Sequence, residues 1–123
     1  MFTYLYWQEK NSSLQRLVNI LKKSTTKPNS HHFFNIKNKS IFTHVKLNIY
    51  PDGGVARIRI YGEMMIKKKF GKKIINLTSV LNGATPIACN NEHFGRAENI
   101  LAPGTGKNMG DGWETRRSRG KNF

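Results

Sequence analysis

The segment from residue 90 to residue 117 is rich in side chains that suit hydrolytic chemistry. It joins carboxylates, an imidazole, an amide and a guanidinium, which belong to Glu92, His93, Asn99, Asp111, Glu114 and Arg116. A carboxylate or an imidazole can take a proton from water, and an arginine can hold a carboxylate through two parallel hydrogen bonds. The segment is also dense in glycine and asparagine, which is typical of a long functional loop.

The same residues fit a purely structural role as well. Glu92 and Asp111 would then cap turns, and His93 would hydrogen-bond the backbone. Phe94 and Trp113 would fill the edge of a core. Residue types and spacing leave both interpretations open.

Other motifs fail on spacing. Gly104, Gly106 and Gly110 miss the G-x-G-x-x-G pattern of dinucleotide-binding loops. Gly106-Lys107 does not complete the G-K-[ST] end of a phosphate-binding loop, because Asn108 follows in place of serine or threonine. The histidines form no cluster at metal-ligand spacing. We therefore expect no dinucleotide, nucleoside triphosphate, metal or other cofactor.

The charge of the chain is strongly positive but unevenly distributed. The formal net charge is +14, yet the stretch from residue 77 to residue 115 is slightly negative. The excess lies in a lysine run at residues 67–73, in the last residues and in lysines before residue 47. Such runs are typical of solvated linkers and tails, so nucleic acid is the least expected partner.

Cysteine content and hydropathy indicate the compartment. Cys89 is the only cysteine, which excludes an internal disulfide and a cysteine-based zinc cluster and fits a reducing environment. No apolar run approaches the roughly 20 residues that cross a bilayer. We expect a cytoplasmic protein, with the peroxisome as the alternative, and no membrane partner.

Local patterns predict mostly β-structure. Apolar residues at helical spacing predict a short amphipathic helix over residues 14–23, followed by a loop with turn formers at Pro28 and Asn29. Alternation predicts a strand from residue 42 to Pro51 and a second strand over residues 55–61. Pro51-Asp52-Gly53-Gly54 would join these two strands as a β-hairpin.

The second half of the chain carries weaker signals. Residues 62–73 lose periodicity and gain lysines, which indicates an exposed connector. Residues 77–81 predict one helical turn that ends at Asn82, with Gly83 as its cap. Residues 87–89 predict a short buried strand.

Two stretches resemble the signatures of the allantoicase family. Residues 43–62, THVKLNIYPDGGVARIRIYG, resemble the pattern that closes the first of the two family repeats. The opening of the second repeat is similar to three short runs in order, at residues 92–95 (EHFG), 99–100 (NI) and 108–117 (NMGDGWETRR). The resemblance covers about residues 29–119.

The resemblance implies a fold and a division of the chain. Each family repeat is a jelly-roll β-sandwich similar to galactose-binding-like domains, so this chain would be mainly β with two incomplete repeats. We expect a divergent segment at residues 1–28, the end of the first repeat at 29–62, a basic linker at 63–76 and the start of the second repeat at 77–123.

The resemblance also implies an activity. Allantoicases hydrolyse allantoate to ureidoglycolate and urea in purine and allantoin breakdown, and the full-length protein is expected to be a homo-oligomer. Candidate catalytic residues are Asp111, Glu114, His93 and Glu92. Candidate substrate-binding residues are Arg116, Arg117, Asn99 and Trp113, with either arginine as the anchor of the substrate carboxylate.

Two half-sandwiches would leave strand edges and apolar faces uncovered. We therefore expect the isolated chain to be marginally stable, aggregation-prone and inactive. The alternative function is a non-catalytic galactose-binding-like module that holds a ligand in its loops.

Overall fold

A computed structural model describes residues 2–9, 17–65 and 73–118 of the chain. By internal contacts the chain divides into two compact units. The first unit holds the residues up to Asp52 together with Ser118, and the second holds Gly53–Arg117. The two units are described separately below.

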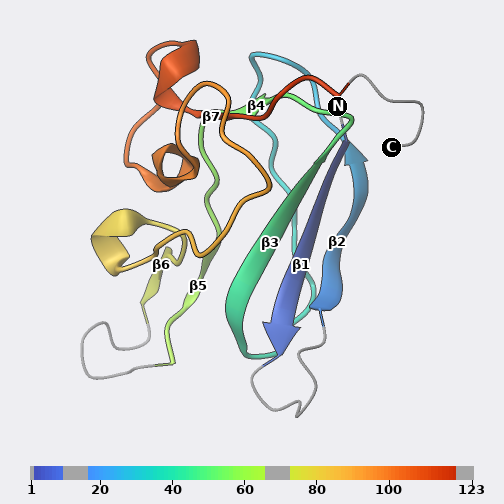
Figure 1. The fold of residues 1–123 in the computed structure, drawn as a ribbon. Helices are drawn as coiled ribbons and strands as arrows, with labels where there is room; N and C mark the ends of the chain where they lie inside the picture. Colours follow the sequence, from blue (N-terminus) through green and yellow to red (C-terminus); the bar gives the residue numbers. More distant parts are fainter. Residues whose placement is uncertain (1, 10–16, 66–72, 119–123) are drawn as a thin grey trace. The chain divides into compact units, whose positions relative to one another are not determined.

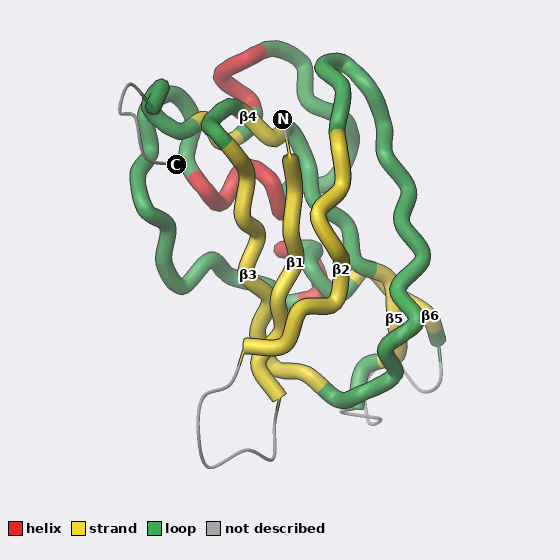
Figure 2. Tube along the Cα trace, turned by 90° about the vertical axis from the view of Figure 1, so that its right-hand side faces the viewer, coloured by secondary structure: helices red, strands yellow, loops and turns green. Residues whose placement is uncertain are grey.

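The first unit is built on a three-stranded antiparallel sheet. Its strands are β1 (Phe2–Glu9), β2 (Leu17–Thr25) and β3 (Phe42–Tyr50), in the order β2-β1-β3. Figure 1 and Figure 2 both show β1 running between its two neighbours. The strand predicted from residue 42 to Pro51 is confirmed as β3.

Alternation along β3 explains why this segment forms a strand. Val45, Leu47 and Ile49 are half-buried, whereas His44 and Lys46 are exposed. A period of two residues places successive side chains on opposite faces of a strand. The sequence pattern therefore identified the strand correctly, although its partner, β1, was not predicted.

The helix predicted over residues 14–23 is wrong. Residues 17–23 belong to β2, which pairs with β1 from Leu17 opposite Gln8 to Thr25 opposite Phe2; residues 14–16 lie outside the described residues. Val18 and Ile20 are β-branched and half-buried, so this segment also has the two-residue alternation of a strand. A ten-residue helix is only marginal in water, so pairing with a neighbouring strand prevails.

The connection from β2 to β3 is a loop, as expected. Asn29 follows Pro28 with a φ of 48°, in the left-handed region that asparagine tolerates. Residues 31–41 form no helix or strand. The turn formers therefore predicted this connection correctly.

The β-hairpin predicted around Pro51 is wrong. Residues 57–60 form no ladder with β3; instead β4 (Gly54–Val55) pairs with β7 (Trp113–Glu114). Further along, β5 (Tyr61–Glu63) pairs with β6 (Ile74–Asn76). The strand that follows the turn residues therefore pairs with a segment about sixty residues later rather than across the turn.

The remaining elements of the second unit are short 3₁₀ turns. They are η1 (Val80–Asn82), η2 (Ala97–Leu101) and η3 (Met109–Asp111). η1 confirms the predicted helical turn, because Gly83 follows it with a φ of 90° and donates its N–H to the carbonyl of Val80. Gly83 thus takes the left-handed conformation that glycine adopts at low cost.

One other prediction for this region is wrong. The buried strand at residues 87–89 is absent, because these residues are exposed and form no strand, with Ile87 at 74% exposure. The connector over residues 62–73 stays a prediction, and β5 and β6 form a ladder at its two ends. Residues 66–72, which carry most of the lysine run, lie outside the described residues.

Side-chain burial is described for residues 17–65 and 73–118. The buried apolar side chains there are Ile60, Ala97, Ile100 and Trp113, which belong to the second unit. The chain from residue 58 is tied to η2 by the N–H of Ile58, which donates to the carbonyl of Ile100 at 2.9 Å.

The expectation of a mainly β protein is confirmed, while the described residues form separate small sheets and no closed sandwich. No helix in the described part of the chain is long and apolar enough to span a membrane.

Candidate functional site

The loop that carries the candidate residues is fixed by a close approach of three backbone segments. Gly95 has a φ of 61°, and a Cβ atom there would lie 1.8 Å from the carbonyl oxygen of Gly112. A Cβ atom on Gly112 would in turn lie 2.7 Å from the carbonyl oxygen of Val55. Glycine is therefore needed at both positions, because any side chain would separate the loop from the strand beside it.

Asp111 is held by Arg57. The Arg57 Nη2 atom lies 3.2 Å from Asp111 Oδ2, and Arg57 Nη1 also donates to the Asp111 backbone carbonyl. The backbone N–H of Lys107 donates to the same Oδ2 at 2.9 Å. The Lys107 N–H, the Arg57 guanidinium and the Lys107 charge together hold the pKa of Asp111 below its usual range, so the carboxylate is ionised at neutral pH.

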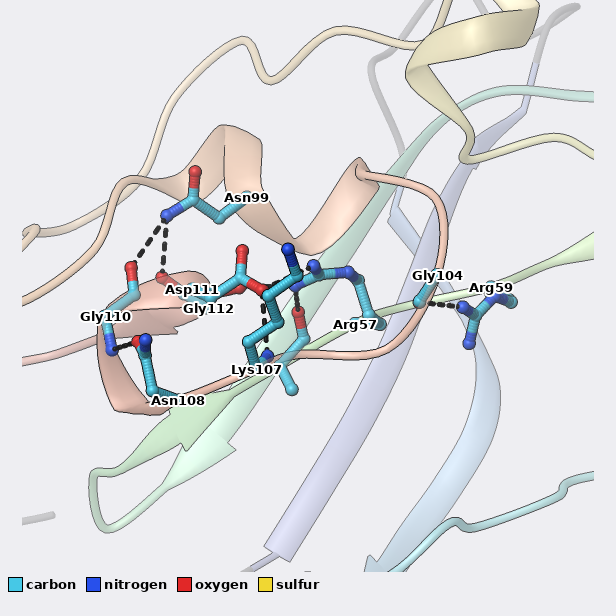
Figure 3. Close-up of polar contacts among 10 residues, drawn as sticks. Arg57, Arg59, Asn99, Gly104, Lys107, Asn108, Gly110, Asp111 and Gly112 are labelled. Atoms are coloured by element: carbon cyan, nitrogen blue, oxygen red, sulfur yellow. Dashed lines mark hydrogen bonds and ion pairs between the residues drawn. The ribbon is translucent and has the colours of Figure 1, made fainter.

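Arg57 belongs to the candidate site, and sequence reasoning did not select it. Its side chain is 7% exposed, although alternation along the strand predicted over residues 55–61 groups it on one face with Arg59 and Tyr61. In the structure Arg59 and Tyr61 are exposed, and Arg59 reaches only the carbonyl of Gly104, whereas the Arg57 side chain is buried against Asp111 (Figure 3). Nothing in the local pattern separates Arg57 from Arg59, because the difference is made by Asp111, which is distant in sequence.

Arg57 and Asp111 line an open depression of about 540 Å³. The rest of its wall comes from the loop between η2 and η3, namely Ala102, Pro103, Gly104, Thr105, Lys107 and Asn108. Figure 3 shows the Lys107 side chain running beside Arg57 and Asp111. The depression therefore combines two cations, one carboxylate, a hydroxyl and an amide.

Glu92 and His93 have structural contacts. Glu92 Oε1 accepts a hydrogen bond from the N–H of Ala97 at 2.8 Å, so it caps the first turn of η2. The His93 N–H donates to the carbonyl of Glu114 at 2.9 Å, and its ring lies edge-on to Phe94 with the centroids 4.5 Å apart. Both side chains remain largely exposed.

Asn99 and Trp113 also support the loop from within. Asn99 Nδ2 donates to the carbonyls of Gly110, at 3.3 Å, and Gly112, at 3.1 Å (Figure 3). Trp113 is 6% exposed, and its Nε1 donates to the carbonyl of Asn91 at 2.9 Å. Neither side chain lines the depression.

The last three candidates lie on β7 and just after it. Glu114 pairs with Gly54 in the ladder, and its carboxylate has no ion-pair partner among the described residues. Arg116 is anchored through its backbone N–H, which donates to Asn91 Oδ1 at 2.7 Å. The side chains of Arg116 and Arg117 are exposed and, like Glu114, lie outside the wall of the depression.

The structure thus separates the candidates into two groups. Asp111 lines the depression, together with Arg57, Lys107 and Asn108, which had not been chosen. Glu92 and Trp113 hold the loop in place, as the structural interpretation of the sequence proposed, and Asn99 does so as well. Chemically, the depression offers positive charge and hydrogen-bond donors, which suit an anionic ligand.

The chain matches a protein-family model described as the allantoicase repeat. The match has two parts, residues 5–65 and residues 75–123. It begins well before residue 29, where our own resemblance began, so β2 and most of β1 also lie within it. The ladder between β4 and β7 joins a strand of the first part to a strand of the second.

Curated relatives point the same way. The chain is 50% identical over 102 residues to a probable allantoicase from Photobacterium profundum and 47% identical over 104 residues to one from Acinetobacter baylyi. These alignments cover 81% and 85% of the chain and 31% of each relative, so the chain spans about a third of their length. No solved structure matches it. With the family model matching nearly the whole chain in two consecutive parts, the chain belongs to the allantoicase family.

Proposed function

We propose that this chain contributes the junction between two repeats of an allantoicase, which hydrolyses allantoate to ureidoglycolate and urea. The observation that carries the proposal is the match of two consecutive parts of the chain to the allantoicase repeat model, together with relatives named as probable allantoicases. On this proposal each repeat, when complete, is a jelly-roll sandwich. The segment boundaries at residues 28, 62 and 76 remain predictions.

The reaction defines what the site must supply. The bond between the methine carbon of allantoate and one ureido nitrogen breaks, the oxygen of water joins that carbon, and a proton reaches the departing urea nitrogen. A cation must hold the substrate carboxylate, and an acid and a base must move the protons. The polar loop of the second unit holds groups of all three kinds.

The roles divide according to the contacts of each group. Glu114 is half-buried and His93 is exposed. Neither side chain has an ion-pair partner in the described part of the chain, so both are free to carry protons. Asp111 is ionised and engaged by Arg57, which suits a base that also orients the guanidinium. Glu92 and Asn99 keep the loop in shape.

A chimeric enzyme tests the function. The matching third of the Photobacterium relative is replaced by this chain, and urea release from allantoate is measured beside the intact relative. We expect the chimera to release urea and the chain alone to release none. A chimera that folds, with a cooperative melt and the oligomeric state of the intact relative, yet releases no urea would refute the proposal.

The same chimera tests the acid–base residues. Asp111→Asn should lower the turnover number by at least about a hundredfold, the low end of what one general acid or base contributes. Glu98→Gln is the matched control, because Glu98 is an exposed carboxylate in an ion pair with Arg96 at 3.3 Å, away from the depression. Unchanged turnover of the Asp111 variant would remove Asp111 from the catalytic residues.

A second candidate function is ligand binding without catalysis. It is favoured by the structural hydrogen bonds of two predicted catalytic carboxylates, since Glu92 caps η2 and Asp111 holds the Lys107 N–H. A glycan-binding screen beside the urea assay separates the two functions. Glycan binding by a chimera that releases no urea would favour this candidate.

A further inference from the structure

Arg57 has more hydrogen-bond donors than partners. A guanidinium carries five N–H groups. Nη1 donates to the carbonyl of Ala56 at 2.7 Å and to the carbonyl of Asp111, and Nη2 donates to Asp111 Oδ2. Nε is buried and has no hydrogen-bond partner. Two N–H groups of a side chain that is only 7% exposed are therefore unpaired within the described residues.

The unpaired donors lie on one edge of the guanidinium. Asp111 takes hydrogen bonds from both Nη atoms and so occupies the end of the planar fork. The side edge, formed by Nε–H and the second Nη2–H, remains. Its two N–H groups are parallel, which is the geometry that a carboxylate accepts through both of its oxygens. A buried donor without a partner is costly, so such an edge indicates a missing acceptor.

The charge around Arg57 favours an anion as that acceptor. Arg57 and Lys107 line the depression, and Arg59 stands at its rim, where Nη2 donates to the carbonyl of Gly104. Asp111 is the single carboxylate in the wall. The wall therefore carries a net positive charge, because the single carboxylate of Asp111 cannot neutralise both Arg57 and Lys107.

Neutral donors complete the wall. Asn108 Oδ1 accepts the N–H of Gly110 at 3.0 Å, which leaves its amide Nδ2 as a donor. Thr105 adds a hydroxyl, and Ala102 and Pro103 add an apolar side. This mixture suits a small organic acid whose carboxylate meets the cations while an amide-like group meets Asn108 and Thr105.

The loop that carries these groups is held in place before any ligand arrives. Arg59 fixes Gly104, Asp111 fixes the Lys107 backbone, and Asn99 fixes Gly110 and Gly112 (Figure 3). A site whose donors are held in advance loses less conformational entropy when the ligand binds. The exposed arginines at positions 116 and 117 have no comparable support from the loop.

We propose that the depression between Arg57 and Lys107 binds the carboxylate of a small ureido acid, with Asp111 holding the guanidinium in orientation. This proposal rests on the proposed function for the identity of the acid, and it moves the carboxylate anchor from Arg116 or Arg117 to Arg57. Lys107 is the second cation of the site. Asp111 orients the guanidinium in this site, in addition to the role as a base proposed for it above.

Titration of the chain itself tests the site by nuclear magnetic resonance. The probes are acetate, N-carbamoylglycine and allantoate, with urea as the neutral control and chloride at equal ionic strength as the simple anion. The Nε–H resonance of Arg57 and the backbone amide of Lys107 report binding directly. We expect the three carboxylates to shift both resonances with saturation, and we expect urea and chloride to leave them in place.

Two lysine variants make the test specific. Lys107→Gln should weaken the binding of N-carbamoylglycine about tenfold, which corresponds to about 1.4 kcal/mol. Lys73→Gln is the matched control, because Lys73 is an exposed lysine of the same unit outside the depression, and its affinity should equal that of the wild type. Neither variant alters a buried residue, so both should fold.

The outcomes separate this proposal from the proposed function. Equal affinity in the wild type and Lys107→Gln, or shifts confined to the amides of residues 116 and 117, would overturn the site. Saturable carboxylate binding that depends on Lys107 would support it even if the chimeric enzyme released no urea, a result that would refute the proposed function alone.

Discussion

Arg57 and Asp111 lie 54 positions apart in the chain, and their side chains meet at 3.2 Å between Nη2 and Oδ2. Arg57 lies in the first part of the family match and Asp111 in the second. The neighbouring ladder between β4 and β7 joins the same two parts, and the N–H of Thr115 donates to the carbonyl of Gly53 at 3.1 Å. Residues of both parts of the family match therefore build one compact unit around the candidate site.

The ion pair predicts how stability depends on pH. Because the pKa of Asp111 is lowered in the folded state, its contribution is complete above the unfolded-state pKa of about 3.9 and is lost as pH falls through the lower folded-state value. The difference in melting temperature between the wild type and Asp111→Asn should therefore be present at pH 6 and shrink toward pH 2. Melting followed by circular dichroism across this range measures it.

Glu98→Gln serves as the control for that series. The ion pair of Glu98 with Arg96 is exposed, and such pairs contribute little to stability. Its acid sensitivity should follow that of the wild type. An Asp111→Asn variant with the same pH dependence as the wild type would contradict the role assigned to the pair.

Gly95 should be among the least replaceable residues of the second unit. Gly95→Ala requires a left-handed alanine, which costs about 1–2 kcal/mol, and places a methyl group against the Gly112 carbonyl. With overpacking of about 1–3 kcal/mol in addition, the total of about 2–5 kcal/mol is enough to unfold a marginally stable unit. Urea denaturation followed by tryptophan fluorescence measures the loss.

Gly83→Ala separates strain from crowding. Gly83 also has a positive φ, at 90°, but a Cβ atom there meets nothing within 4 Å. This variant should lose only the conformational term of about 1–2 kcal/mol. Equal losses at positions 83 and 95 would show that the chain at Gly95 does not approach the Gly112 carbonyl as closely as the structure indicates.

Thr78 joins two segments of the second unit through its hydroxyl. Thr78 Oγ1 donates to the carbonyl of Ile58 at 3.0 Å and accepts from the N–H of Ile60 at 3.1 Å, and the residue is 6% exposed. Thr78→Val keeps the shape but leaves a buried carbonyl without this donor, so we expect a loss of about 1–3 kcal/mol. Thr85→Val, at an exposed position, should change stability by less than about 0.5 kcal/mol.

The isolated chain should have low overall stability. Four buried apolar side chains form the described core, whereas Tyr61, Ile74, Leu81 and Ile87 are each at least 65% exposed. Exposed apolar surface of this kind promotes association. We expect a melting temperature below about 50 °C and growth of light scattering on heating. A cooperative melt above about 50 °C, within the usual mesophilic range, would contradict this expectation.

The sequence alone determined the family and the features that depend on neighbouring residues. The two signature stretches identified an allantoicase relative, alternation identified β3, and the Asn82-Gly83 pair identified the end of a helical turn. Each of these signals is local, because capping, turn formation and strand periodicity are set within a few residues.

The tertiary structure decided which segments pair and which side chains are buried. Residues 17–23 became a strand because β1 lies beside them, and Val55 found β7 rather than the strand before the turn. Arg57 and Arg59 have the same type and the same position in the alternating pattern, yet only Arg57 meets Asp111. Pairing and burial depend on contacts between residues far apart in the chain, and a local pattern carries no information about which distant segment supplies the partner.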